Sequence, residues 1–187
     1  KNNSKKNNIL FISRFGGFSP EYHTMTKYID LIEKYDITII LPSTIDCSVN
    51  KVFNFLKKLN KEKEIIYCRE NKSFNDVQKY FKGPVYIDND TAFNVDYSQY
   101  KKIGNGVLYA IRLDKEKNTK IINKFKNEKI NDISKGNYTE WEEFLKELTN
   151  YNEIHTNRAH VSIAGTLLGK KTFVYPSNYY KQKEIYK

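Results

Sequence analysis

Short unbroken apolar runs alternate along this chain with segments in which apolar residues recur every three or four positions. Continuous apolar runs between turn-forming residues are typical of strands buried on both faces, whereas the longer spacing is typical of amphipathic helices. The runs predict strands at residues 8–13, 36–44, 64–70, 83–90, 106–114, 153–156 and 171–177.

The helical spacing predicts helices between these strands, at residues 21–35, 48–61, 73–82, 138–151 and 157–168, with another beginning near residue 178. Regular alternation of strands and helices favours the α/β class, with a mostly parallel, Rossmann-like sheet and helices on both of its faces. A domain boundary is expected near residues 62–64 or within the polar stretch 115–137. We therefore expect a partial α/β segment over residues 1–62 and a Rossmann-like domain over 63–187, or one continuous domain.

The composition of the 187 residues permits a buried core, because 39% are hydrophobic and 29% are charged. The formal net charge is +10, and 28 of the 32 basic residues are lysine. Such a balance favours anionic partners, among them nucleic acid, acidic glycans, phosphorylated metabolites and anionic lipid, without choosing between them. The lysines are spread along the chain without an arginine-rich stripe, so we expect solvated surface charge and no specific nucleic-acid partner.

The cysteines and the lengths of the apolar runs bear on metal sites, the cellular compartment and membrane-spanning segments. The chain has two cysteines, Cys47 and Cys68, with no CxxC pair and no metal-like spacing of cysteine and histidine. We therefore expect no metal site, and a reducing, cytoplasmic compartment, although two cysteines could in principle pair. No apolar run approaches the ~18 residues that a membrane-spanning helix needs, so no transmembrane segment is expected.

All four arginines follow or end predicted strands. In open α/β sheets, ligands bind outside the carboxyl ends of the strands, so these residues are expected at one ligand-binding edge. The planar guanidinium holds a carboxylate or phosphate through two hydrogen bonds, which lysine cannot do. Buried ion pairs with Glu70, Asp90 or Asp114 are the structural alternative. The candidate anion ligands are Arg14, Arg69, Arg112 and Arg158.

The helix predicted at 157–168 begins with polar residues that suit an anion site. The first turn of a helix presents unpaired N–H groups and a partial positive charge. Thr156 or Asn157 can cap this helix, and Arg158 and His160 lie in its first turn. One interpretation is an ordinary capped core helix with a packed histidine. The other is a site for anion binding and proton transfer, which the neighbouring Arg158 favours.

Several short stretches, taken in order, resemble the polysaccharide pyruvyl transferase family. The stretch "IHTNRAHVSIAGTLLGKKTFVYPSNYYKQK" resembles the family's C-terminal signature, in which T-D-R-L-H opens a helix and a Gly-Lys pair leads into a strand. Upstream, "IILPSTI" resembles the family's "LPQTI", "YCRENKSF" its "REK-S-" segment, and "IDNDTAF" its "PDPAF" segment. The stretch "RFGGF" is similar to its glycine-rich loop. These matches cover residues 9 to 185.

The resemblance implies a fold similar to the glycosyltransferase B type, with the donor held by the C-terminal domain at a domain junction. It implies phosphoenolpyruvate (PEP) as donor substrate, a glycan as acceptor, and a pyruvate ketal as product, with no cofactor or metal. Arg69, Arg158 and His160 match the family residues that hold PEP. Histidine ordinarily titrates near neutral pH, which suits His160 as the acid and base.

Departures from the family pattern keep other functions open. Asn157 stands where the family has Asp, Ala159 where it has Leu, and Ser43 where it has Gln. Most of the family's N-terminal, sugar-binding half has no counterpart in the sequence. A nucleotide-sugar glycosyltransferase using the same helix end is one alternative. A non-catalytic module that binds glycans or polyanions is another.

Overall fold

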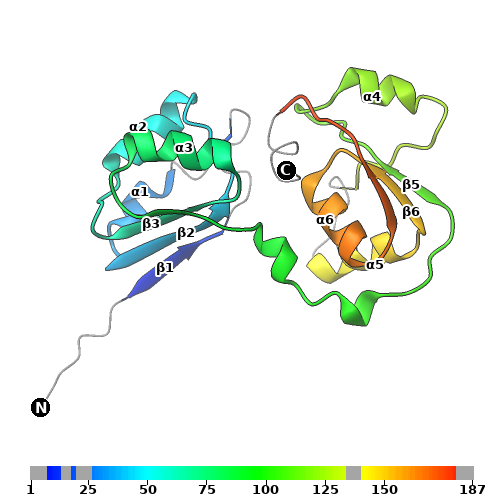
Figure 1. Cartoon of the computed structure of the whole chain (residues 1–187), viewed down its shortest axis with the longest axis horizontal. Coiled ribbons are helices and arrows are strands. Elements are labelled where there is room, and N and C mark those ends of the chain that lie inside the picture. Colours follow the sequence, from blue (N-terminus) through cyan, green and yellow to red (C-terminus); the bar gives the residue numbers. More distant parts are fainter. Residues whose placement is uncertain (1–7, 14–17, 20–26, 134–139, 180–187) are drawn as a thin grey trace, which may run out of the picture. The chain divides into compact units, whose positions relative to one another are not determined.

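The computed structural model describes residues 8–13, 18–19, 27–133 and 140–179, and the chain divides into two compact units, residues 1–91 and 92–187 (Figure 1). Unit 1 contains β1 (Ile9–Ile12), α1 (Ile29–Ile32), β2 (Ile37–Ser43), α2 (Asn50–Lys58), β3 (Glu64–Cys68), α3 (Asn71–Tyr80) and β4 (Val85–Ile87). Unit 2 contains β5 (Val107–Ala110), α4 (Thr119–Lys124), α5 (Trp141–Thr149), β6 (Glu153–Thr156), α6 (Ala159–Leu167) and β7 (Lys171–Val174). Two 3₁₀ turns, Thr91–Asn94 and Ser98–Tyr100, precede β5.

Two parallel sheets replace the single sheet that the sequence predicted. Unit 1 holds a four-stranded sheet in the order β1-β2-β3-β4, and unit 2 holds a three-stranded sheet in the order β5-β6-β7. The α/β class and the parallel pairing are confirmed, and every predicted strand range contains an observed strand. The two compact units divide after Thr91, because β3 and β4 continue the first sheet beyond β2.

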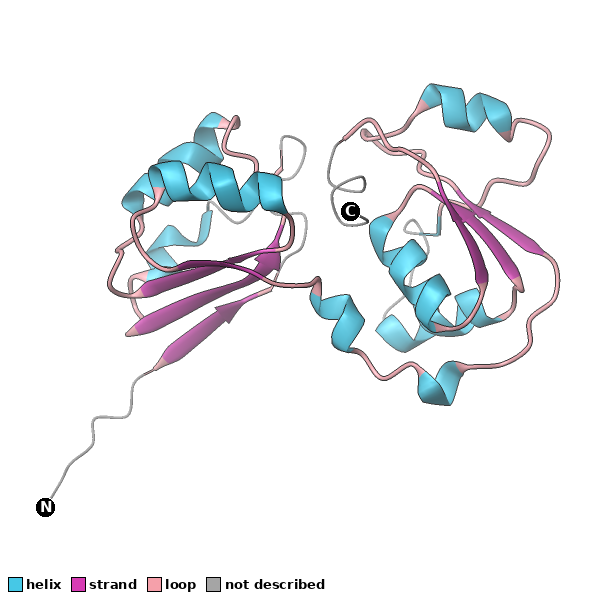
Figure 2. Cartoon of the chain, viewed as in Figure 1, coloured by secondary structure: helices cyan, strands magenta, loops and turns pink. Residues whose placement is uncertain are grey.

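The helices of unit 1 pack on one face of its sheet, so the prediction of helices on both faces is wrong for the described residues of this unit. Parallel strands that follow one another in sequence order, joined by right-handed crossovers, must carry their connecting helices on the same side. Ile32 of α1 and Phe55 of α2 accordingly share one core cluster with Ile40 and Ile66 of the sheet (Figure 2). On the opposite face, Phe11 is 60% exposed.

Unit 2 builds its core from α5 and α6 against β5 and β6. Ile154 is fully buried among residues of both helices, including Leu148 and Val161. Small residues in α6 allow a close approach to the sheet, since a Cβ added at Gly165 would lie 2.8 Å from the Thr172 hydroxyl of β7. The helix ends as predicted at Gly169, whose φ of 77° closes a Schellman motif.

Other expected elements are shorter than predicted or lie outside the described residues. Of the helix predicted at 21–35, α1 accounts for Ile29–Ile32, and residues 20–26 fall outside the described part. The helix predicted near residue 178 extends into residues 180–187, which also lie outside it. The polar stretch 115–137 contributes α4, which Asn118 caps by accepting a hydrogen bond from the Lys120 N–H.

Glu64 offers a stability test of unit 1, because its carboxyl is 3% exposed on the helix-covered face of the sheet. Burial raises the pKa of Glu64, and its Oε2 atom has no hydrogen-bond partner among the described residues. A folded-state pKa above the ordinary value means that stability is lost as the pH rises through this range. We expect Glu64→Gln to stabilise the protein by about 1 kcal/mol at pH 7 and to have little effect near pH 4, measured by thermal unfolding. A lower melting temperature of the variant at pH 7 would contradict the assignment.

Candidate active site

The carboxyl edge of the unit 2 sheet gathers three of the residues that the sequence singled out. Arg112 follows β5 by one residue, and Asn157 and Arg158 directly follow β6. Because β5 and β6 are parallel, these residues lie at the same end of the sheet. The Asn157 Oδ1 accepts a hydrogen bond of 2.7 Å from the Arg112 backbone N–H, which ties the two strand ends together.

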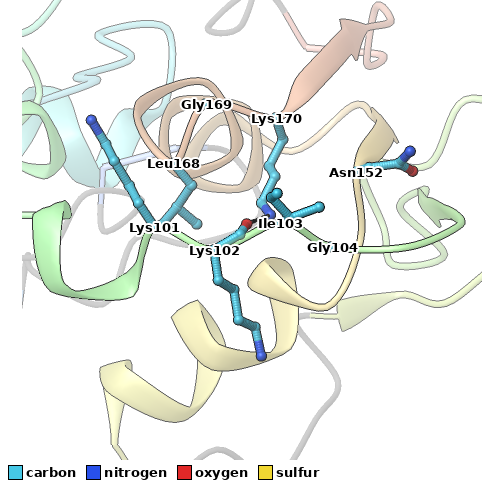
Figure 3. Close-up of a pocket in the computed structure, with 8 residues that line it drawn as sticks. All are labelled: Lys101, Lys102, Ile103, Gly104, Asn152, Leu168, Gly169 and Lys170. Atoms are coloured by element: carbon cyan, nitrogen blue, oxygen red, sulfur yellow. Dashed lines mark hydrogen bonds between the residues drawn. The ribbon is translucent and has the colours of Figure 1, made fainter.

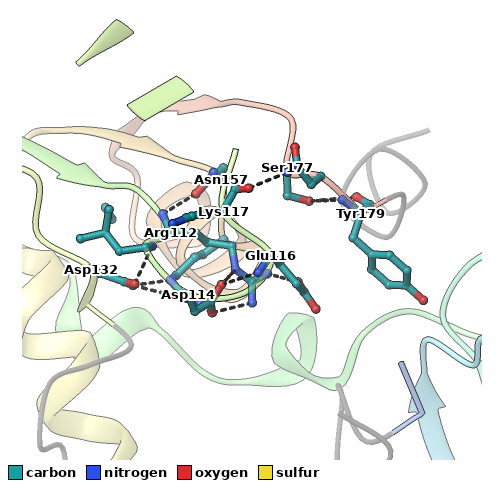
Figure 4. Close-up of polar contacts among 12 residues, drawn as sticks. Arg112, Asp114, Glu116, Lys117, Asp132, Asn157, Ser177 and Tyr179 are labelled. Atoms are coloured by element: carbon teal, nitrogen blue, oxygen red, sulfur yellow. Dashed lines mark hydrogen bonds and ion pairs between the residues drawn. The ribbon is translucent and has the colours of Figure 1, made fainter. Parts of the chain in front are cut away.

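Arg112 is held by carboxylates from its own loop. Its Nε and Nη2 donate to the two oxygens of Asp114 at 2.9 and 3.0 Å, and its Nη1 forms an ion pair with Glu116 (Figure 4). All three guanidinium nitrogens therefore contact acidic oxygens. These contacts are the buried ion pairs that the sequence left open as the alternative for Arg112. They occupy the guanidinium with carboxylates of its own loop.

Arg158 is held along one side of its guanidinium only. Its Nε and Nη2 lie 2.6 Å from the Asp132 Oδ1, and its Nη2 donates to the Asp114 Oδ2 at 3.1 Å. The remaining nitrogen, Nη1, forms no hydrogen bond or ion pair with the residues that the structure describes. Asp114 thus bridges the two arginines, and the described residues pair with Arg158 through its Nε and Nη2.

The helix that follows Arg158 begins at Ala159, whereas the sequence predicted a start at residue 157. Arg158 occupies the N-cap position of α6 with extended backbone angles, and its own N–H donates to the Thr156 hydroxyl at 3.0 Å. No side chain caps the helix. His160 is the second residue of the helix and is half-buried. The first turn of α6 therefore presents backbone N–H groups next to Arg158 and His160.

Asn157 is more deeply buried than a typical ligand-binding residue, at 1% exposure. Its Oδ1 serves the Arg112 N–H, whereas its Nδ2 has no hydrogen-bond partner within the described residues. An aspartate would supply the same acceptor, so the replacement of the family's Asp preserves this link between β5 and β6. What asparagine adds is an amide donor in place of a carboxylate oxygen.

The ion pairs at this edge join two guanidinium groups to the carboxylates of Asp114, Glu116 and Asp132. Burial tends to raise the pKa of Asp114, but hydrogen bonding and charge from Arg112, with the charge of Arg158, lower it from 3.8 to about 2. Because this folded-state pKa is depressed, the ion pairs stabilise the fold above about pH 3.8 and weaken as the pH falls toward 2. The network is therefore intact at neutral pH.

Arg69 lies at the corresponding edge of unit 1 and is 7% exposed. Its Nη1 forms an ion pair with Asp90, and its Nε donates to the Thr44 hydroxyl at 2.8 Å. Burial raises the pKa of the neighbouring Glu70, against hydrogen bonds from Ser73 and Thr44 and the charge of Arg69. The ion pair with Asp90 is again one that the sequence left open. Arg14 lies outside the described residues.

Two acidic residues of the network, Asp132 and Glu116, were not predicted from the sequence. Both lie in the polar stretch 115–137, where no periodic pattern singles out an acidic side chain. The available signal was the pair of isoleucines, Ile130 and Ile133, that flank Asp132. Ile130 forms an isolated parallel bridge with Tyr109 of β5, and Ile133 is 1% exposed. Together they bring Asp132 to the strand end.

A separate hollow of about 400 Å³ lies at the amino edge of the unit 2 sheet (Figure 3). The Lys170 Nζ at its margin donates to the backbone oxygens of Lys102 and Thr149, the last residue of α5. The side chains of Lys101 and Lys102 extend in opposite directions, so they form no cradle around a single ligand. Lys170 therefore binds the carbonyl at the end of α5. The hydrogen bonds and ion pairs of the candidate residues lie at the carboxyl edge.

The described residues also bear on the requirements of metal sites and reactive thiols. Their histidine, cysteine, aspartate and glutamate side chains form no group of three that could hold a metal ion. Cys47 and Cys68 are free thiols, and burial raises the pKa of Cys47 to about 12. No helix within the described ranges has the length and apolar character needed to cross a bilayer.

The two parallel sheets and the helices that connect their strands define an α/β protein with a Rossmann-like arrangement. The chain belongs to the polysaccharide pyruvyl transferase family, whose model matches residues 7–179.

Comparison with solved structures gives the same fold. The chain is similar to the crystal structure of a functionally uncharacterised protein from Klebsiella pneumoniae, with a TM-score of 0.71 and 28% sequence identity. The similarity covers 100% of this chain and 74% of the Klebsiella chain. No curated protein sequence matches this chain.

Proposed function

We propose that the protein is a transferase that moves pyruvate from PEP to a sugar of a surface polysaccharide. Family membership over residues 7–179 supports the reaction class. The observation that carries the donor assignment is the one-sided pairing of Arg158, which leaves Nη1 next to the open first turn of α6. A carboxylate or phosphate group of PEP can accept hydrogen bonds from both, because each presents N–H donors and positive charge.

In the proposed reaction, two hydroxyl oxygens of one sugar form bonds to C2 of PEP. The C2–O bond to the phosphoryl group breaks, and phosphate leaves. The C2–C3 double bond becomes a single bond as the methylene carbon gains one proton and becomes a methyl group. The sugar hydroxyls lose two protons, of which one balances the proton on the methyl carbon and the other leaves with phosphate. His160, the second residue of α6, is the proposed acid and base for these transfers.

The remaining predicted residues have different parts in this proposal. Asn157 holds the edge through its Oδ1, and its Nδ2 is a further donor for the substrate. Arg112 supports Arg158 through the shared Asp114. The donor-binding roles of Arg69 and Arg14 rest on the family resemblance of their segments.

The proposal is tested by ligand-dependent thermal stability of the wild-type protein, followed by assays of phosphate release. We expect PEP at about 100 times its dissociation constant to add about 2.7 kcal/mol to the stability, and equal concentrations of UDP- and GDP-sugars to add nothing. With a panel of methyl hexopyranosides as acceptors, phosphate should be released from PEP. Stabilisation by a nucleotide sugar instead of PEP would identify a glycosyltransferase. Salt-sensitive binding to acidic polymers without any effect of PEP would identify a polyanion-binding module.

A further inference from the structure

We propose that Asp132 is a positioning residue that orients Arg158 for the donor anion, an inference that rests on the proposed function for its substrate. The Asp132 Oδ1 accepts a hydrogen bond from the Arg158 Nε and forms an ion pair with its Nη2, both at 2.6 Å. The other oxygen, Oδ2, accepts a hydrogen bond of 2.8 Å from the Leu113 backbone N–H. The carboxylate is therefore bound to the backbone that follows β5 and also to the Arg158 side chain that follows β6.

The contrast with Arg112 shows what Asp132 contributes. Carboxylates meet Arg112 at Nε, Nη2 and Nη1, whereas Asp132 and Asp114 contact only the Nε and Nη2 side of Arg158. An arginine side chain has several rotatable bonds, so an unrestrained Arg158 would lose much rotamer freedom on binding an anion. Asp132 removes that freedom in advance and directs Nη1 away from the ion pair.

Electrostatics alone would argue against an acid in this place. Asp132 adds negative charge to a network that already contains Asp114 and Glu116, and this charge opposes the approach of an anion. Its side chain is 2% exposed, so the charge is poorly screened by water. If Asp132 were only a counter-charge, its neutralisation would strengthen anion binding. If Asp132 positions Arg158, its neutralisation weakens anion binding.

The test compares Asp132→Asn with Asp96→Asn, a matched control in the same unit. Asp96 is an exposed acid whose Oδ1 accepts from the Ser98 N–H, a contact that asparagine can also make. We expect Asp132→Asn to weaken PEP binding about tenfold in thermal-shift titrations, and Asp96→Asn to leave it within about twofold. Asp132→Glu should recover part of the affinity. Unchanged or tighter binding by Asp132→Asn would overturn the proposal.

A second measurement separates this inference from the donor assignment. In the ¹⁵N-labelled protein without ligand, the Arg158 Nε–H signal, identified by its loss in Arg158→Lys, should be protected from hydrogen exchange. We expect Asp132→Asn to remove this protection while the backbone amide spectrum of α6 is retained. If wild type does not bind PEP, the proposed donor is wrong, and the exchange result alone decides whether Asp132 fixes Arg158. Persistent protection in Asp132→Asn would overturn the positioning role.

Discussion

Replacement of Arg158 by alanine is expected to abolish stabilisation of the protein by PEP. The variant loses the guanidinium that we propose binds the donor, and it also leaves Asp114 and Asp132 with less positive charge to balance them. Loss of two charge-assisted hydrogen bonds corresponds to at least about 3 kcal/mol, so the dissociation constant should rise by more than about 100-fold. Thermal-shift titration and calorimetry with PEP measure this directly.

The same substitution also affects folding, which the experiment must separate from binding. Asp132 is 6% exposed, and breaking a buried ion pair from one side costs about 3–5 kcal/mol because a charge is left uncompensated. The double variant Arg158→Ala with Asp132→Asn removes that orphaned charge and should recover most of the stability. It should still fail to bind PEP. Arg158→Lys keeps the charge without the planar fork, and we expect about tenfold weaker binding.

Retention of PEP-dependent stabilisation by the Arg158→Ala variant would show that the donor does not depend on Arg158. Arg112 could not take over without first releasing Asp114 and Glu116, since all three of its guanidinium nitrogens contact them. The result would therefore exclude both arginines of this edge as ligands of the donor.

The strands and their parallel pairing were predictable because the sheets are built from continuous apolar runs such as "IILP" and "VLYA". The covering of only one face in unit 1 was not. Ile39 and Ile40 look alike in sequence, yet Ile40 is buried under helices and Ile39 is only half-buried. Strand order decides this difference, and the periodicity of one strand carries no information about its neighbours.

The positions of the candidate residues were predictable where they follow from the ends of strands. Arg158 comes two residues and His160 four residues after β6, so the rule for strand carboxyl ends places them at that edge of the sheet. The rule could not say what holds an arginine in place. Asp132 reaches Arg158 across 26 residues through the bridge between Ile130 and Tyr109. Such contacts follow from tertiary packing, which a polar stretch of sequence does not reveal.

Replacement of His160 by glutamine is expected to slow pyruvyl transfer by about 100-fold or more while PEP affinity changes by less than about threefold. Proton transfer by a positioned side chain typically contributes ~10²–10⁴-fold to a rate, and glutamine preserves polarity and approximate size without titrating near neutral pH. Phosphate release from PEP with a methyl hexopyranoside acceptor measures the rate.

His155 provides the matched control, because it is a second histidine of unit 2 with a different environment. Its ring stacks between Tyr109 and Phe173, and its two nitrogens contact the Tyr175 hydroxyl and Glu153 at 2.8 and 2.7 Å. It alternates along β6 with Ile154 and Thr156, so it lies on the face away from α6. His155→Gln should lower the melting temperature but change the rate of transfer by less than about threefold. A large loss of rate in His155→Gln, with an unchanged rate in His160→Gln, would assign the proton transfer elsewhere.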